Sequence, residues 1–111
     1  KTPEWVEQRR TVAPWVDVYE NPQELLLMAD MPGVNKDAVN IRLDKNQLTL
    51  EGAVKDPELS GEAGFMFSRT FLIPNGIDPD RIAAKLKHGV LTVHLPKHDK
   101  LRPRQITVTD G

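Results

Sequence analysis

Apolar residues alternate with polar ones over short stretches of this chain, and Pro, Gly, Asn and Asp separate the stretches. A period of two is typical of strands with one buried face, and helical spacing is not sustained anywhere over the length of a stable helix. The predicted strands are residues 15–20, 24–30, 39–43, 47–52, 65–73, 82–87 and 90–95. These strands leave no room for crossover helices. The pattern therefore predicts an all-β fold, an antiparallel two-sheet immunoglobulin-like β-sandwich.

Alternation also assigns the faces of individual strands. The core-facing residues of three strands are Val39, Ile41 and Leu43, then Leu48 and Leu50, then Ile82, Ala84 and Leu86. The last strand is apolar on both faces, because Leu91, Val93 and Leu95 alternate with Val90, Thr92 and His94. We expect both faces of that strand to be covered, one of them by a partner or a terminal segment.

Turn residues mark the ends of the strands. Residues 31–33 read Met-Pro-Gly, where Pro lacks an amide donor and Gly tolerates positive φ. Residues 44–47 predict a hairpin with Asn46 in the left-handed region, and residues 87–89 join the last two strands in the same way. Pro79 and Asp80 are suited to begin one short helical turn. Asp78 and Asp80 are accordingly interpreted as turn and cap residues rather than as an acid–base pair.

The composition changes at both ends of the predicted sandwich. We predict an N-terminal arm at residues 1–13, the β-sandwich domain at residues 14–96 and a C-terminal extension at residues 97–111. The extension is too charged to pack as core. Ile106 and Val108 point the same way if their segment is extended, and two such apolar side chains need a groove to bury them.

Composition and charge narrow the choice of partners. The chain has 111 residues, 39% of them apolar, which suffices for one domain with a modest core. The 15 Lys and Arg nearly balance the 16 Asp and Glu, so no long-range field favours nucleic acid or an anionic membrane. The longest apolar run, residues 25–29, is far short of the roughly 20 residues that span a bilayer. Cysteine is absent, which fits either redox compartment; we expect a cytoplasmic protein.

Catalytic patterns are missing from the sequence. His88, His94 and His98 have neither HExxH spacing nor a carboxylate triad, which argues against a metal site. Ser60 and Ser68 lie outside any G-x-S-x-G motif. No glycine-rich phosphate loop occurs, so no cofactor is expected and no coupling to ATP. We expect a protein that is not an enzyme.

Five segments, in order, resemble the alpha-crystallin domain of the bacterial and plant small heat-shock proteins, and together they form a specific signal. The segments are Pro14-Trp15-Val16-Asp17-Val18-Tyr19-Glu20, Ala29-Asp30-Met31-Pro32-Gly33-Val34, Phe67-Ser68-Arg69-Thr70-Phe71-Leu72-Ile73-Pro74, Ala84-Lys85-Leu86-Lys87-His88-Gly89-Val90-Leu91 and Ile106-Thr107-Val108. The third is similar to the family's F-x-R-x-F-x-[IL]-P strand, the fourth to its A-x-x-x-x-G-V-L signature and the last to its I-x-[IV] motif.

The resemblance implies an ATP-independent chaperone, a holdase that binds partly unfolded client proteins and assembles as a homodimer and higher homo-oligomer. It also implies that Ile106 and Val108 dock into a groove between two edge strands of another subunit. In this chain the groove residues would be Val39, Ile41, Leu43, Ile82, Ala84 and Leu86. Such an added strand protects a sheet edge reversibly.

Several alternatives remain open on the sequence alone. Arg69 shares a predicted face with Phe67 and Phe71, so it is expected to be buried and to need a partner, either inside the subunit or across an interface. Residues 52–65 form a shorter loop than the strand-exchanging loop usual in the family, which leaves the dimer mode open. A co-chaperone or adaptor sandwich that binds one folded partner is the alternative function. A carbohydrate-binding sandwich is disfavoured by the presence of only two Trp and one Tyr.

Overall fold

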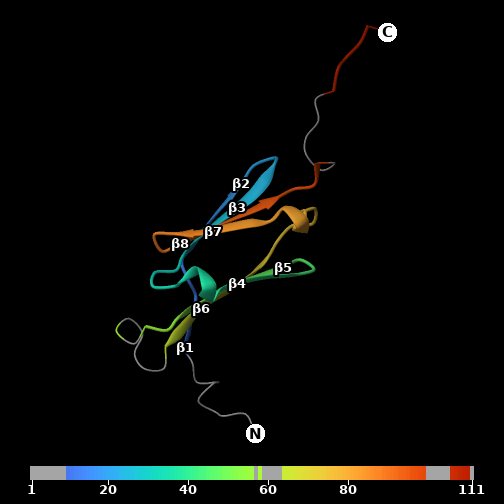
Figure 1. The fold of residues 1–111 in the computed structure, drawn as a ribbon. Coiled ribbons are helices and arrows are strands. Elements are labelled where there is room, and N and C mark those ends of the chain that lie inside the picture. The colour runs from blue at the N-terminus through green and yellow to red at the C-terminus, as the bar shows by residue number, and fades with distance from the viewer. Residues whose placement is uncertain (1–9, 57, 59–63, 100–105, 111) are drawn as a thin grey trace.

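Two four-stranded sheets form a β-sandwich in the computed structural model, which describes residues 10–56, 58, 64–99 and 106–110 (Figure 1). One sheet has the strand order β1-β6-β5-β4 and the other the order β2-β3-β8-β7. The strands are β1 (Arg10–Val12), β2 (Val16–Glu20), β3 (Glu24–Asp30), β4 (Val39–Asp44), β5 (Gln47–Val54), β6 (Phe65–Leu72), β7 (Ala83–Lys87) and β8 (Val90–Pro96). Neighbouring strands are antiparallel except β1 and β6, which confirms the predicted fold class.

The seven predicted strands are present, with ends that differ by at most two residues. β1 was not predicted. It pairs in parallel with the first three residues of β6, and its own three residues are exposed. A strand so short, without a buried face, leaves no alternating pattern in the sequence.

The core lies between the sheets and includes Leu48, Leu50, Leu91, Val93 and Leu95 from the faces that the pattern assigned. The other residues predicted to face the core are at its border: Val39, Ile41, Leu43, Ile82 and Leu86 are only partly buried, and Ala84 is exposed. The members of the core are Leu25, Leu27, Ala29, Met31, Val34, Leu48, Leu50, Val54, Phe67, Ile73, Ile77, Leu91, Val93 and Leu95. No polar or charged residue among those described is buried with them. Apolar burial is therefore the main source of stability of the sandwich.

Two hairpins show how local backbone conformation sets the strand connections. In the β4–β5 hairpin the left-handed residue is Lys45, with φ of 56°, so the prediction of Asn46 was wrong. Asn46 is held by the neighbouring corner instead: its Nδ2 donates to Asn75 Oδ1 at 2.7 Å, and its carbonyl accepts from Ile73 N at 2.8 Å. In the β7–β8 hairpin both His88 and Gly89 have positive φ, as a type I′ turn requires.

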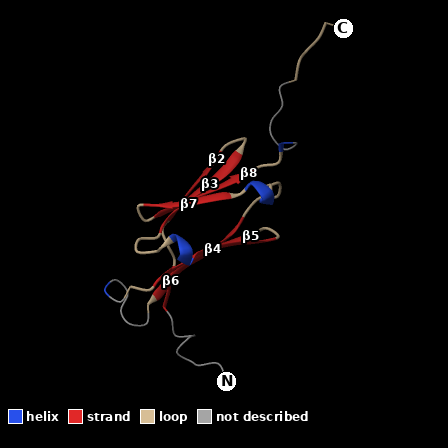
Figure 2. Cartoon of the chain, in the orientation of Figure 1, coloured by secondary structure: helices blue, strands red, loops and turns tan. Residues whose placement is uncertain are grey.

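Two short 3₁₀ turns complete the connections (Figure 2). The turn η2 (Pro79–Arg81) begins where the sequence predicted, and Asp78 Oδ1 caps it by accepting from Asp80 N at 3.1 Å. The turn η1 (Lys36–Ala38) precedes β4 and was not predicted, because it has no side-chain cap. No helix in the described part of the chain is long and apolar enough to cross a membrane.

The two faces of β8 differ within the single chain, and cover of the second face by a partner or a terminal segment stays a prediction. Leu91, Val93 and Leu95 are buried in the core, whereas Val90 is only half-buried and His94 is exposed. His94 Nδ1 lies 2.9 Å from Glu24 Oε1 on the outer side of the sheet. The sequence predicted cover there because Val and Thr suit either a buried face or a half-exposed sheet surface.

The predicted division into arm, domain and extension stays a prediction, and the structure adds contacts at both boundaries. β1 lies in the predicted arm, at residues 10–12. In the predicted extension, Lys97 Nζ donates to Glu20 Oε2 at 2.8 Å, and His98 N donates to the carbonyl of Gly76 at 2.8 Å. The first two residues of the extension are therefore bonded to the sandwich.

Candidate functional site

Two edge strands border the groove that forms the candidate site. β4 is the last strand of one sheet and β7 the last strand of the other, so among the described residues neither has a strand partner on its outer side. Free edges of this kind present unpaired backbone donors and acceptors to solvent. A groove lies between them and is lined by residues of both strands.

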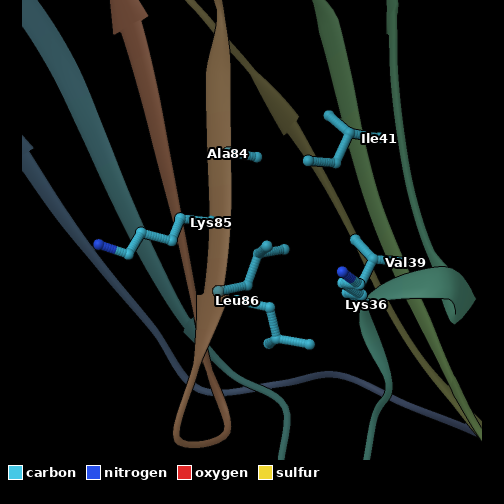
Figure 3. Close-up of a pocket in the computed structure, with 7 residues that line it drawn as sticks. Lys36, Val39, Ile41, Ala84, Lys85 and Leu86 are labelled. Atoms are coloured by element: carbon cyan, nitrogen blue, oxygen red, sulfur yellow. The ribbon is translucent and has the colours of Figure 1, made fainter.

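Apolar side chains from both strands line the groove, which has a volume of about 250 Å³. Figure 3 shows Val39 and Ile41 reaching across from β4 towards β7, with Ala84 and Leu86 on the opposite wall. Lys85, between these two, points away from β4. The complete lining is Lys36, Val39, Ile41, Ala84, Lys85, Leu86 and Leu91.

Four of the six residues predicted for the groove are brought together there. The other two, Leu43 and Ile82, are partly buried against the core and do not line the cavity. The groove is thus confined to the part of β4 next to η1, which alternation alone does not reveal. Three lining residues were not predicted: Leu91 is a core residue of β8, Lys85 belongs to β7, and Lys36 belongs to the unpredicted turn η1.

The groove is suited to binding an extended apolar segment. Val39 and Ile41 are two residues apart on one wall, and Ala84 and Leu86 have the same spacing on the other, so each pair repeats about every 7 Å. A bound strand presents its alternate side chains at that same spacing. The only charged lining residues are the two lysines, and no group of three His, Cys, Asp or Glu near enough to hold a metal occurs among the described residues.

Arg69 differs from the sequence prediction in one respect: it is exposed, not buried. It stands on β6 opposite Leu50, and its guanidinium carbon lies 4.9 Å from the centre of the Phe71 ring. No ion pair links Arg69 to a carboxylate in the described part of the chain. The predicted need for a partner followed from the cost of burying the guanidinium away from water. Because Arg69 is exposed to solvent at the margin of the sheet, that cost does not arise.

Ile106 and Val108 also have described positions, and both are almost fully exposed, at 84% and 91%. Neither side chain packs on the sandwich of its own chain. Their i, i+2 spacing equals that of the paired groove residues, although the two sites are not in contact here. The chain therefore carries both an open apolar groove and two exposed apolar side chains of matching spacing.

Comparison with known proteins shows which family and which proteins the chain resembles. The model of the Hsp20/alpha crystallin family matches residues 17–109. A curated relative from Leptospira interrogans, "Probable 15 kDa heat shock protein", is 36% identical over 101 residues, covering 86% of this chain and 78% of the relative. "Heat shock protein 16" of Schizosaccharomyces pombe is 35% identical over 104 residues, covering 85% and 73%.

Solved structures share the fold. Heat shock protein 16.0 from Schizosaccharomyces pombe superposes with a TM-score of 0.70 and 34% identity over 89% of this chain and 77% of its own. A small heat-shock protein from Xylella fastidiosa, described as having a distinct high order structure, gives a TM-score of 0.68 and 31% identity over 89% and 98%. Both likenesses extend over nearly the whole sandwich.

Proposed function

Since the chain belongs to the Hsp20/alpha crystallin family of small heat-shock proteins, we propose that it is an ATP-independent holdase that covers the apolar surface of partly unfolded proteins and prevents their aggregation. The open groove between β4 and β7 carries this proposal. Its apolar walls and free strand edges suit extended, apolar segments in general, which is what a client exposes on unfolding. No nucleotide is needed for such binding.

The same groove is proposed to receive Ile106 and Val108 of another copy. Burying these two side chains contributes about 3–5 kcal/mol before ordering costs are subtracted. Contacts of that strength exchange readily, so a tail leaves its groove when a client segment competes for it. In this proposal, residues 14–96 are the binding domain, residues 97–111 are the tether that carries the docking side chains, and residues 1–13 are a flanking arm. Homo-oligomers held by tails follow, and a cytoplasmic location stays a prediction.

The function is tested by heating an aggregation-prone enzyme with the protein, without ATP, and following light scattering. We expect the wild-type chain to suppress scattering. Ala84→Asp, which places a charge in the groove at an exposed position, should lose most of that suppression. Asn40→Asp is the matched control, because Asn40 is exposed on the opposite face of β4.

The outcomes separate the parts of the proposal. A wild-type chain that leaves scattering unchanged at a molar excess is not a holdase. Equal suppression by Ala84→Asp and the wild type would show that the groove is not the client site. A monomeric chain that binds one folded protein stoichiometrically would point to the adaptor alternative instead.

A further inference from the structure

The outer face of the β2-β3-β8-β7 sheet is a second surface, which shares only Lys85 with the lining of the groove. Strand register places its residues in rows that run across the four strands. One row contains Asp17, Met28, Thr92 and Lys85, and the next contains Tyr19, Leu26, His94 and Ala83. A third contains Asp30, Val90 and Lys87, with Trp15 beside Asp30 because Asp30 N donates to the Trp15 carbonyl at 2.9 Å.

Charge changes sign across this face. Acidic residues lie on the β2 and β3 side, at Asp17, Glu24 and Asp30, and basic residues lie on β7, at Lys85 and Lys87. On the two middle strands, Met28, Val90 and Thr92 are uncharged and half-buried, and the charged Glu24 and Asp30 lie at the ends of β3. No described residue forms an ion pair with Asp17, Lys85 or Lys87.

This distribution is self-complementary, and we propose that the face binds the same face of a second copy. The twofold axis lies between β3 and β8, parallel to the strands. Rotation about it places β2 of one copy over β7 of the other and β3 over β8, while each row stays opposite itself. Asp17 then faces the second copy's Lys85 twice, once on each side of the axis.

Side-chain size and chemistry agree with the same arrangement. Tyr19, 55% exposed, is placed over the small Ala83, and Trp15, 74% exposed, is placed over Lys87, where the ammonium lies against the indole face. β3 of the second copy lies over a hollow of about 430 Å³ above β8, lined by Met28, Lys85, Lys87, His88, Val90, Thr92 and His94. Sheets stacked face to face lie about 10 Å apart, a separation that these side chains span.

A polyanion is a poorer occupant of this face. Lys85 and Lys87 would attract it, but Asp17 and Asp30 lie in the same rows and would repel it. The second copy satisfies both signs at once. Charge complementarity therefore selects an isologous contact between two chains.

Charge reversal tests the contact, using full-length chains that carry Ile106→Ala and Val108→Ala so that tails do not add to the mass. Asp17→Lys and Lys85→Asp are made separately in this parent, and masses are measured by native mass spectrometry at low ionic strength. Each reversal creates two like-charge contacts and should lower the mean mass about twofold. The dissociation constant should rise about tenfold. Asp44→Lys, an exposed reversal on the other sheet, is the control.

Mixing the two single variants provides the decisive comparison. A heterodimer of Asp17→Lys with Lys85→Asp has opposite charges at both sites, so the mass of the parent should return on mixing. A monomeric parent, reversals that leave its mass unchanged, or a mixture that stays dissociated would each overturn the contact. Binding of heparin by a monomeric chain would also do so. The Asp17→Lys results do not bear on the holdase proposal, because Asp17 lies on β2 and does not line the groove between β4 and β7, whereas Lys85 borders both surfaces.

Discussion

Gly52 occupies a position on β5 where the core leaves no room for a side chain. A Cβ there would lie 2.8 Å from Met31 Sδ and 3.1 Å from Val34 Cγ1, and the Met31 side chain is fully buried. Gly52→Ala should therefore lower the free energy of unfolding by about 1–3 kcal/mol. Denaturant titration measures this.

A second substitution checks the cause of that loss. Met31→Ala on its own opens a cavity and destabilises, but combined with Gly52→Ala it also removes the sulfur that the new methyl meets. The double variant should be more stable than the sum of the two single losses predicts. Strict additivity would mean that steric conflict with Met31 is not the cause.

Arg69 belongs to the same scale, and its predicted role at an interface between subunits stays a prediction that substitution can test. It is exposed and contacts the Phe71 ring, an interaction worth about 0.5–1 kcal/mol at exposed sites. Arg69→Gly should therefore lower the oligomer mass in light scattering while circular dichroism shows unchanged β-content. Thr70→Gly, the exposed neighbour, controls for the effect of glycine in a strand. Unchanged oligomer mass in Arg69→Gly would show that Arg69 has no interface role.

At the scale of elements, the β7–β8 hairpin depends on two residues with positive φ. Gly89 adopts positive φ without steric cost because it has no Cβ, whereas His88 adopts it despite its side chain. Gly89→Ala should cost about 1–2 kcal/mol. It would also bring a Cβ within 3.3 Å of Pro32 Cα. His88→Asn should instead raise the melting temperature slightly, since Asn tolerates the left-handed region. Thermal unfolding measures both, and equal effects of the two substitutions would contradict the type I′ assignment.

The sequence predicts those elements whose burial leaves a period of two. β5 was predicted from alternation, whereas β3 and β8 were predicted as short apolar segments bounded by turn residues; all three have one buried and one less buried face. β1 was missed because it has no buried residue, and η1 because it has no side-chain cap. Of the site, the walls were predictable from Val39, Ile41, Ala84 and Leu86, but the lining by Lys36 and Leu91 arises from three-dimensional packing. Arg69 is exposed because it lies at the margin of the sheet, and the alternation of residues along the sequence does not show where that margin is.

For the whole molecule, the two proposed contacts use different surfaces and different forces. The tail-to-groove contact buries the apolar side chains of Ile106 and Val108, so it is insensitive to moderate salt. The sheet-to-sheet contact depends on exposed charges at Asp17 and Lys85, which salt screens. Because the groove faces the gap between the sheets and the charged face is turned outward, one chain can use both contacts at once.

Ionic strength should therefore separate the two levels of assembly. Raising salt from about 0.05 M to about 0.5 M shortens the screening length from roughly 14 Å to roughly 4 Å, which removes most of the attraction across the stacked sheets. A chain with Ile106→Ala and Val108→Ala should then lose about half its mean mass, whereas the chain with Asp17→Lys, with its tail intact, should keep its mass. Sedimentation velocity at both salt concentrations measures this. Equal salt sensitivity of the two variants would mean that a single type of contact holds the assembly together, because only contacts of different physical origin respond differently to the same ions.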